Sequence, residues 1–226
     1  MAVQNRAPAV SSGGYKIVAR NSDRGEIYLY GPIGADWFGE GVTAKQFADD
    51  MKKLNGVKTI DLRINSEGGD VFAGKAMYSL LTEHKARVVV HIDGLAASAA
   101  SYIAMAGDEI NISEAAFVMI HNAWTVAVGG ADDFRRQADI LEQVNDSICD
   151  VYVSRTKKTK QQCKDWMDAE TWFTGKDAVA NGFADKVVAN MKVAATVRDP
   201  AKFKNLPSSL LPRRSAALAT IASLTK

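Results

Sequence analysis

The chain has little of several features that define other classes of protein. Its only cysteines, Cys149 and Cys163, are too few and too far apart for a disulfide framework or a cysteine metal site, and both are expected to be packing residues. No apolar run reaches the roughly 18 to 20 residues of a membrane-spanning helix, and the N-terminus lacks a charged-then-apolar signal pattern. A net charge of +2 is too small to indicate a nucleic-acid surface. We therefore expect a cytoplasmic protein that binds neither membrane nor nucleic acid.

The remaining composition is typical of a single large globular domain. The sequence is 47% hydrophobic and 24% charged, which suffices for a substantial core. Strand-like runs alternate with segments of helical periodicity: strands at 26–33, 59–65 and 87–93, and helices at 44–54, 71–83 and 97–105. This alternation predicts an α/β fold with a mostly parallel sheet covered on both faces. A longer helix at 131–154 exceeds what one sheet face requires, so part of its apolar stripe is expected to contact another copy of the chain.

Two polar residues stand out against this background. Ser98 lies among very small residues in the run 93–102 (DGLAASAASY), and His121 follows the apolar run 116–120. A serine attacks a carbonyl only when a base takes its proton and backbone amides stabilise the oxyanion. Alone, the serine would more often lie on the small-residue face of a packed helix, and the histidine would be a core residue. Their combination favours acyl-transfer chemistry.

A candidate source of the amides lies upstream, in residues 62–70 (LRINSEGGD). An alternating apolar run ends there at Gly68 and Gly69, directly before a helical pattern. Glycine permits a positive φ and a close approach to a substrate, and the first amides of a helix have no intrahelical acceptor. An ordinary strand-to-helix turn uses the same residues, so this motif gains weight only together with Ser98 and His121.

In this order, the segments 64–69 (INSEGG), 94–98 (GLAAS) and 119–121 (MIH) resemble the ClpP family of serine peptidases. The resemblance spans about 26–188 and includes 174–185 (TGKDAVANGFAD), which is similar to the closing segment of the family pattern. It implies a ClpP/crotonase-like spiral of βαβ units with a long protruding handle helix. It also implies a nucleophilic Ser98, His121 as general base, and the amides of Gly69 and Ala99 as the oxyanion hole.

The third member of the catalytic triad departs from the family pattern. Thr171 stands at the position where the family has an aspartate, and threonine cannot supply a charge. The run 167–172 (MDAETW) resembles a variant found in ClpP-like proteases of phage head-gene clusters. That resemblance favours Asp168 as the acid, with Glu170 as the alternative.

The resemblance also suggests a function and partners. We expect a serine endopeptidase that acts on polypeptides within a homo-oligomer of one ring or stacked rings, specifically a phage head maturation protease that cleaves capsid or scaffold protein. Neither a metal nor an organic cofactor is implied. The chain has no phosphate-binding loop, so an ATP-dependent AAA+ unfoldase would be a separate and non-obligatory partner.

Two other functions are compatible with the same fold. An imperfect triad at Thr171 would suit a non-catalytic or weakly active assembly subunit. A crotonase-type acyl-CoA enzyme would use paired amides but would not need Ser98 and His121 together.

The chain is predicted to divide into three parts. These are a flexible N-terminal segment at 1–14, the protease domain at 15–189, and a flexible or partly helical C-terminal tail at 190–226, where proline-containing stretches precede an Ala-rich end.

Overall fold

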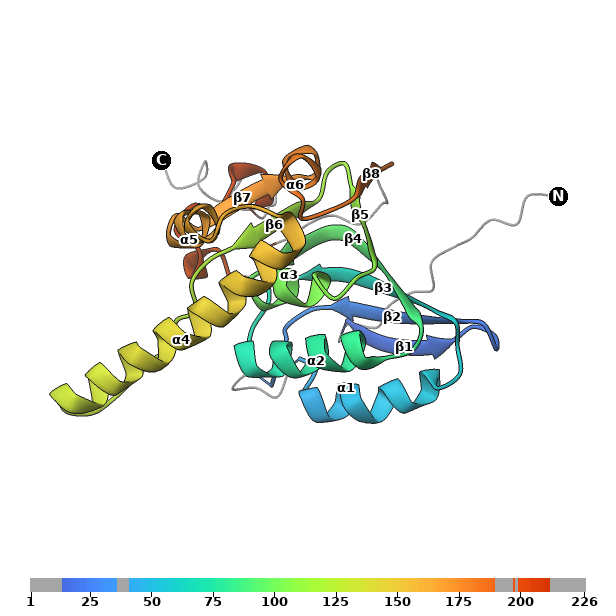
Figure 1. The fold of residues 1–226 in the computed structure, drawn as a ribbon, viewed down its shortest axis with the longest axis horizontal. Coiled ribbons are helices and arrows are strands. Elements are labelled where there is room, and N and C mark those ends of the chain that lie inside the picture. The colour runs from blue at the N-terminus through green and yellow to red at the C-terminus, as the bar shows by residue number, and fades with distance from the viewer. Residues whose placement is uncertain (1–13, 36–40, 190–196, 198, 212–226) are drawn as a thin grey trace, which may run out of the picture.

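The structure is a computed structural model that describes residues 14–35, 41–189, 197 and 199–211. The expected N-terminal segment therefore lies outside the described residues except for Gly14, as does the C-terminal tail beyond residue 211. Over the described residues, one eight-stranded sheet forms the centre of the molecule (Figure 1). Its strands are β1 (Tyr15–Ala19), β2 (Arg24–Tyr30), β3 (Thr59–Ser66), β4 (Arg87–Ala97), β5 (Glu109–Ser113), β6 (Phe117–Ile120), β7 (Thr171–Thr174) and β8 (Lys186–Val188).

The helices follow the strands in the alternation expected from the sequence. They are α1 (Ala44–Met51), α2 (Val71–Glu83), α3 (Ala99–Ala104), α4 (Ala131–Thr156), α5 (Lys160–Asp168) and α6 (Gly175–Asn181). Short 3₁₀ turns occupy Lys52–Leu54, Pro200–Lys202 and Ser208–Leu210. The α/β class with a mostly parallel sheet and a long helix α4 is confirmed, and it is consistent with the ClpP/crotonase fold.

The sheet is parallel except at two strand pairs. Its strands run in the order β1-β2-β3-β4-β5-β8, and β6 pairs with both β4 and β7. Only β1–β2 and β6–β7 are antiparallel. Strand β4 pairs with β5 along its first half and with β6 along its second half. This division brings the C-terminal ends of β4 and β6 side by side.

Strand β4 is longer than its apolar pattern predicts. The expected strand ended at Asp93, whereas β4 continues to Ala97, and the expected helix from Ala97 begins only at Ala99. The small residues after Asp93 allow this extension because they pair with β3 on one side and β6 on the other. Ser98 is therefore the single residue between strand and helix.

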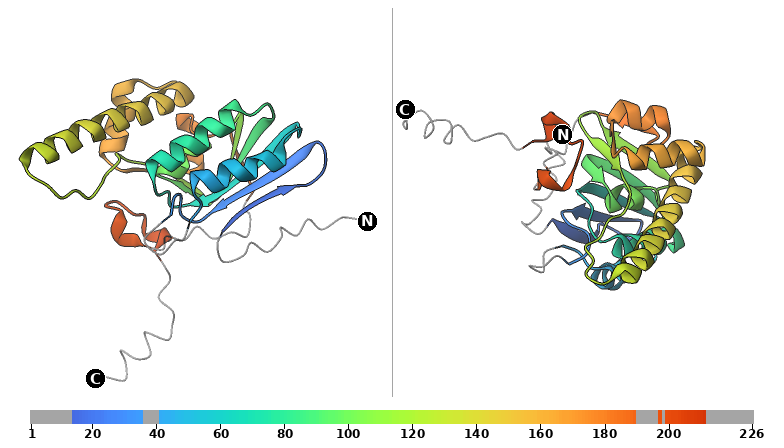
Figure 2. Two further views of the ribbon diagram at one scale, coloured as in Figure 1. Left: turned by 90° about the horizontal axis from the view of Figure 1, so that it is seen from below. Right: turned by 90° about the vertical axis from the view of Figure 1, so that its left-hand side faces the viewer.

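Both faces of the sheet are covered, as parallel strands require. The larger core cluster packs strand residues such as Ile64 and Ile92 against helices, including Met77 and Leu81 of α2. A smaller cluster on the opposite face contains Leu95, Ala97 and Met119 together with Val197 and Leu210. Figure 2 shows the red C-terminal residues on this second face, away from α1, α2 and α4.

Helix α4 has a protruding half and a packed half (Figure 1). Its C-terminal half buries Val144, Ile148, Cys149 and Tyr152, whereas Phe134 in its N-terminal half is exposed. Both cysteines are buried and free of disulfides, and burial raises the pKa of each thiol. No helix within the described ranges is long and apolar enough to cross a membrane.

Candidate active site

A sharp turn between β4 and α3 presents Ser98. Its φ of 54° and ψ of −126° lie outside the regions that a residue with a side chain ordinarily adopts. Gly68 lies against this turn: a Cβ built there would come within 2.6 Å of the Ala97 carbonyl oxygen and 2.7 Å of the Ser98 Cβ. Gly68 therefore has to lack a side chain for the two backbones to approach this closely, and the small residues Ala99 and Ala100 that follow Ser98 are buried in α3.

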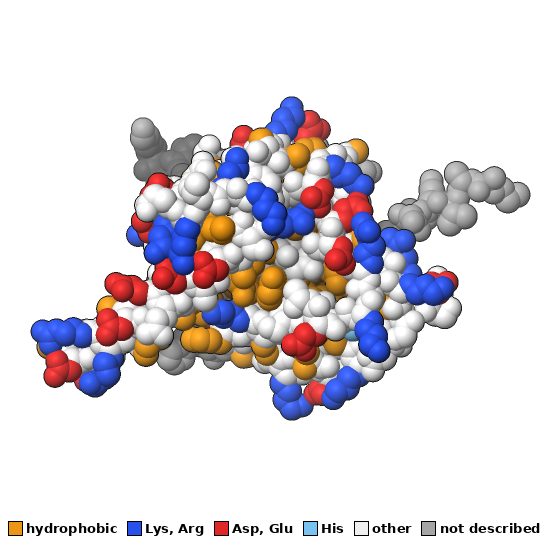
Figure 3. Space-filling model, in the orientation of Figure 1, with side chains coloured by type: hydrophobic (Ala, Val, Ile, Leu, Met, Phe, Trp, Pro, Cys, Tyr) orange, Lys and Arg blue, Asp and Glu red, His pale blue; other side chains and the backbone are white. Residues whose placement is uncertain are grey.

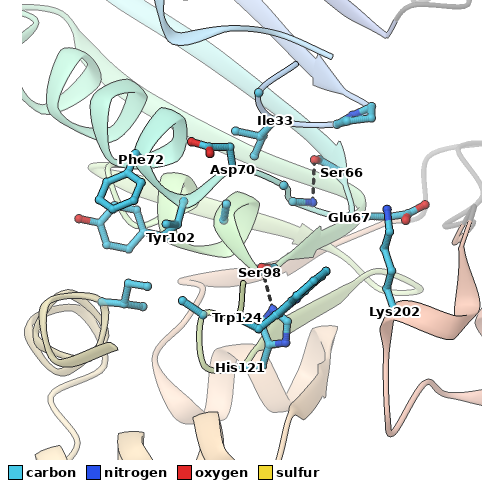
Figure 4. A pocket seen from close by; sticks show the side chains of 18 of the residues that line it. Ile33, Ser66, Glu67, Asp70, Phe72, Ser98, Tyr102, His121, Trp124 and Lys202 are labelled. Atoms are coloured by element: carbon cyan, nitrogen blue, oxygen red, sulfur yellow. Dashed lines mark hydrogen bonds between the residues drawn. The ribbon is translucent and has the colours of Figure 1, made fainter. Parts of the chain in front are cut away.

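The pairing of β4 with β6 places His121 beside Ser98. Ala97 is in register with Met119, and the Ser98 amide donates to the Met119 carbonyl oxygen at 3.0 Å. His121 follows β6 directly, and its Nε2 lies 2.8 Å from Ser98 Oγ (Figure 4). Ser98 and His121, the two residues that the sequence motifs singled out, are therefore within hydrogen-bond distance.

The surroundings of His121 favour a neutral imidazole. Burial lowers its pKa, the Glu170 carboxylate opposes that shift by its negative charge, and the Lys204 ammonium adds to the lowering. A neutral ring can accept a proton at Nε2, which is what a general base must do.

The carboxylate that faces the other ring nitrogen belongs to Glu170. Its Oε2 is 3.8 Å from His121 Nδ1, and its side chain is only 5% exposed. The Asp168 side chain is exposed, and its Oδ1 accepts a hydrogen bond from Asn122 Nδ2 at 2.6 Å. Thr171, at the usual acid position, donates through Oγ1 to a backbone oxygen instead. Glu170, the alternative acid in the sequence analysis, thus lies beside the imidazole. Asp168, the acid favoured there, is bound instead to the side-chain amide of Asn122.

The position of Glu170 results from its backbone and from two donors. Its φ of 47° is unusual for a residue with a side chain and turns the chain between α5 and β7. Oε1 accepts from Trp172 Nε1 at 3.3 Å and from the Asn205 amide at 2.8 Å. Oε2 is the oxygen nearer to His121.

The expected amide donors lie on the same cavity as the serine. The flanking amides of Gly68 and Asp70 donate to Ser66 Oγ and to the Ile33 carbonyl oxygen, which leaves the Gly69 amide with no acceptor among the described residues. Gly69 has a φ of 147°, and a Cβ built there would come within 2.1 Å of that Ile33 oxygen, so a side chain cannot be accommodated. Ala99 is the first residue of α3, so its amide has no acceptor within the helix.

A cavity of about 1120 Å³ opens in front of these groups. Its wall contains Ser98, His121, Gly69 and Ala99, and it extends along apolar side chains of α2, α3 and α4 that include Phe72, Tyr102, Leu141, Val144 and Ile148. Figure 3 shows hydrophobic side chains gathered where α4 approaches α2 and α3. A space of this size and apolar character fits several residues of an extended peptide.

Part of the cavity wall comes from a region that the sequence did not connect with the site. Asp199, Lys202 and Phe203 come from the region predicted to be a tail, and Figure 4 shows Lys202 at the side of the cavity opposite Phe72 and Tyr102. No local motif marks them, because they reach the site only through packing on the second sheet face. The predicted boundary at 189/190 stays a prediction. Within the described ranges, no group of three or more His, Cys, Asp or Glu side chains is arranged to hold a metal ion.

The sequence is similar to known proteases over most of its length. The Clp protease family model matches residues 11–191. The ATP-dependent Clp protease proteolytic subunit 2 of Tropheryma whipplei (strain Twist) is 31% identical over 142 residues, which cover 62% of this chain and 76% of that protein. Proteolytic subunit 1 of Leifsonia xyli subsp. xyli (strain CTCB07) is 30% identical over 62% of this chain and 70% of its own. Proteolytic subunit 1 of Corynebacterium jeikeium (strain K411) is 29% identical over a region that covers 60% of this chain and 73% of that protein.

Proposed function

The chain belongs to the Clp protease family and is a serine-type endopeptidase, and we propose that Ser98 is its nucleophile, His121 its general base and Glu170 its third triad member. The single observation that carries the first two assignments is the 2.8 Å distance between Ser98 Oγ and His121 Nε2. The amides of Gly69 and Ala99 are proposed to form the oxyanion hole, because both line the cavity that Ser98 faces.

The proposed reaction has two steps. Ser98 Oγ attacks the carbonyl carbon of the scissile bond while His121 Nε2 takes the hydroxyl proton, and the oxyanion is stabilised by the two amides. Collapse of the tetrahedral intermediate breaks the C–N bond, and the imidazolium returns its proton to the leaving amine. A water molecule then loses a proton to His121 and attacks the acyl-enzyme, which releases the second product and restores the serine.

The geometry favours Glu170 over Asp168 for the third role. A triad acid stabilises the imidazolium that forms on proton transfer and orients the ring through Nδ1. Glu170 is buried and lies 3.8 Å from that atom, whereas Asp168 is exposed and engaged with Asn122. Catalytic hydrogen bonds that are long in the free enzyme often shorten when substrate binds.

The family implies an oligomeric protease that acts on polypeptide substrates. Consistent with contacts between copies, the protruding half of α4 exposes Phe134, which is 49% accessible, and Ile140, which is 47% accessible. We propose a homo-oligomeric ring or stacked rings. The relatives named above are ATP-dependent, and an unfoldase partner for this chain is proposed to be non-obligatory.

The finer role that we propose is maturation of a phage head by cleavage of capsid or scaffold protein. Its support is the run 167–172 (MDAETW), which resembles phage variants of the family. Incubation of the purified protein with a phage capsid precursor, analysed by mass spectrometry of the fragments, tests this role. Cleavage of unfolded casein but not of any capsid or scaffold precursor would exclude it.

An active-site fluorophosphonate tests the catalytic assignment directly. Wild-type protein is expected to be labelled at Ser98, and Ser98→Ala and His121→Ala to remain unlabelled. The exposed Ser154→Ala variant is a matched control that should label like wild type. Absence of label on assembled wild-type protein would refute the assignment of Ser98 and favour the assembly-subunit alternative.

A further inference from the structure

The C-terminal segment, residues 199–211, packs on the second face of the sheet, away from α1, α2 and α4, at the ends of β4 and β6. Leu210 is buried, and Phe203 and Leu206 are partly buried in the cluster that contains Leu95 and Met119. Leu95 lies near the end of β4, which Ser98 follows, and Met119 lies near the end of β6, which His121 follows. The C-terminal segment is thus anchored beside the proposed catalytic residues.

One aromatic residue of the C-terminal segment covers the proposed base. The Phe203 ring centroid is 6.5 Å from that of His121, with the planes at 38°. It is also 5.3 Å from the Trp172 ring, edge to face at 76°. Trp172 is the residue whose indole N–H donates to Glu170. Phe203 therefore contacts both the imidazole and a donor to its carboxylate partner.

A second residue of the C-terminal segment binds the carboxylate itself. The Asn205 backbone amide donates to Glu170 Oε1 at 2.8 Å, and Asn205 Nδ2 donates to the Ala169 carbonyl oxygen at 2.7 Å. The side chain thus fastens residue 205 to the peptide group that immediately precedes Glu170. The amide, held in this way, occupies Oε1 and leaves Oε2 as the oxygen nearer to His121.

Glu170 depends on hydrogen-bond donors for the direction of its carboxylate, because the turn in its backbone fixes only where the side chain begins. It lies between α5 and β7 with a φ of 47°, so no helical or sheet neighbour sets the direction of its side chain. The hydrogen bond from the other donor, Trp172 Nε1, is longer, at 3.3 Å. The Asn205 amide therefore donates the shorter of the two hydrogen bonds to Oε1.

We propose that Asn205 is a positioning residue for catalysis: its two hydrogen bonds hold Glu170 in the orientation that supports His121. This inference rests on the proposed triad. It assigns to the C-terminal segment a function in the reaction, through Glu170 and without contact with substrate.

The test compares Asn205→Ala with the matched control Ser209→Ala, an exposed position in the same segment. Loss of the side-chain anchor is expected to reduce kcat for a peptide ester about fivefold, the usual net value of one hydrogen bond, with KM unchanged because Asn205 does not line the cavity. In a Glu170→Gln background the same substitution is expected to have no further effect, since coupled residues are non-additive. Equal fold-losses in both backgrounds would overturn the proposal.

A second readout does not depend on turnover. In the Ser98→Ala background, NMR titration of His121 is expected to give a lower pKa when Asn205→Ala is added, because the Glu170 charge, which raises that pKa, is held less firmly near the imidazole once the side-chain anchor is lost. Burial and Lys204 act on His121 in both proteins and do not account for a difference. An unchanged pKa with an unchanged kcat would refute the positioning role. Failure of wild-type protein to label at Ser98 would instead refute the proposed function, while the titration would still report on the position of Glu170.

Discussion

The most informative substitution is Glu170→Gln, because it removes one charge while retaining the shape and the acceptor oxygen of the side chain. Gln can still accept from Trp172 and from the Asn205 amide, so the local fold should remain intact. The amide nitrogen of Gln then takes the place of Oε2 beside His121, so the substitution removes both the charge and the acceptor that face Nδ1.

The magnitude follows from the distance between the two groups. At 3.8 Å, Coulomb's law with an effective dielectric constant of about 20 gives about 4 kcal/mol between a carboxylate and an imidazolium. The imidazolium exists only after proton transfer from Ser98, so this energy is lost in the transition state and not in the ground state. Glu170→Gln should therefore lower kcat/KM about a thousandfold.

The assay is hydrolysis of a fluorogenic peptide ester by the assembled protein, with the fluorophosphonate labelling rate as a second measure. Asp168→Asn is the matched control, since it also removes one carboxylate charge, from the end of α5 two residues before Glu170; its side chain is exposed and accepts a hydrogen bond from Asn122. We expect less than about a twofold change for this control, as for most surface substitutions. A thousandfold loss in Asp168→Asn with near-normal activity in Glu170→Gln would show that the geometric reasoning is wrong.

Three further predictions address other parts of the molecule. Gly68→Ala should lower the free energy of unfolding in urea by about 2 to 4 kcal/mol and prevent labelling of Ser98, because Gly68 has a φ of 92° and its Cβ would collide with the turn; normal labelling would contradict this. Lys204→Ala should move the acidic limb of kcat/KM to higher pH, because the ammonium lowers the pKa of His121 and the protonated ring is inactive; a shift to lower pH would refute it. Thr159→Ala should destabilise the protein by about 1 kcal/mol in urea without changing kcat, because its hydroxyl caps α5; a loss of kcat in folded protein would argue against a purely structural cap.

Residues near one another in sequence were sufficient to predict the core of the site. The apolar run 116–120 placed His121 at the end of a strand, and the small residues placed Ser98 at the start of a helix. Gly68 and Gly69 marked a turn between a strand and a helix. Parallel strands align their C-terminal ends at one sheet edge, so the two side chains meet once β4 pairs with β6. The resemblance to the family rests on these same local segments.

The choice of acid could not be made in this way. Asp168, Glu170 and Thr171 are so close in sequence that only the family resemblance separated them, and it favoured Asp168. Asp168 ends helix α5, whereas Glu170 lies in the following turn with a positive φ. The local sequence determined which strands, helices and turns would form and therefore where Ser98 and His121 lie. Only the tertiary structure decided that Glu170 faces the imidazole, since that orientation depends on Asn205, which is 35 residues away along the chain and reaches the site by packing on the opposite face of the sheet.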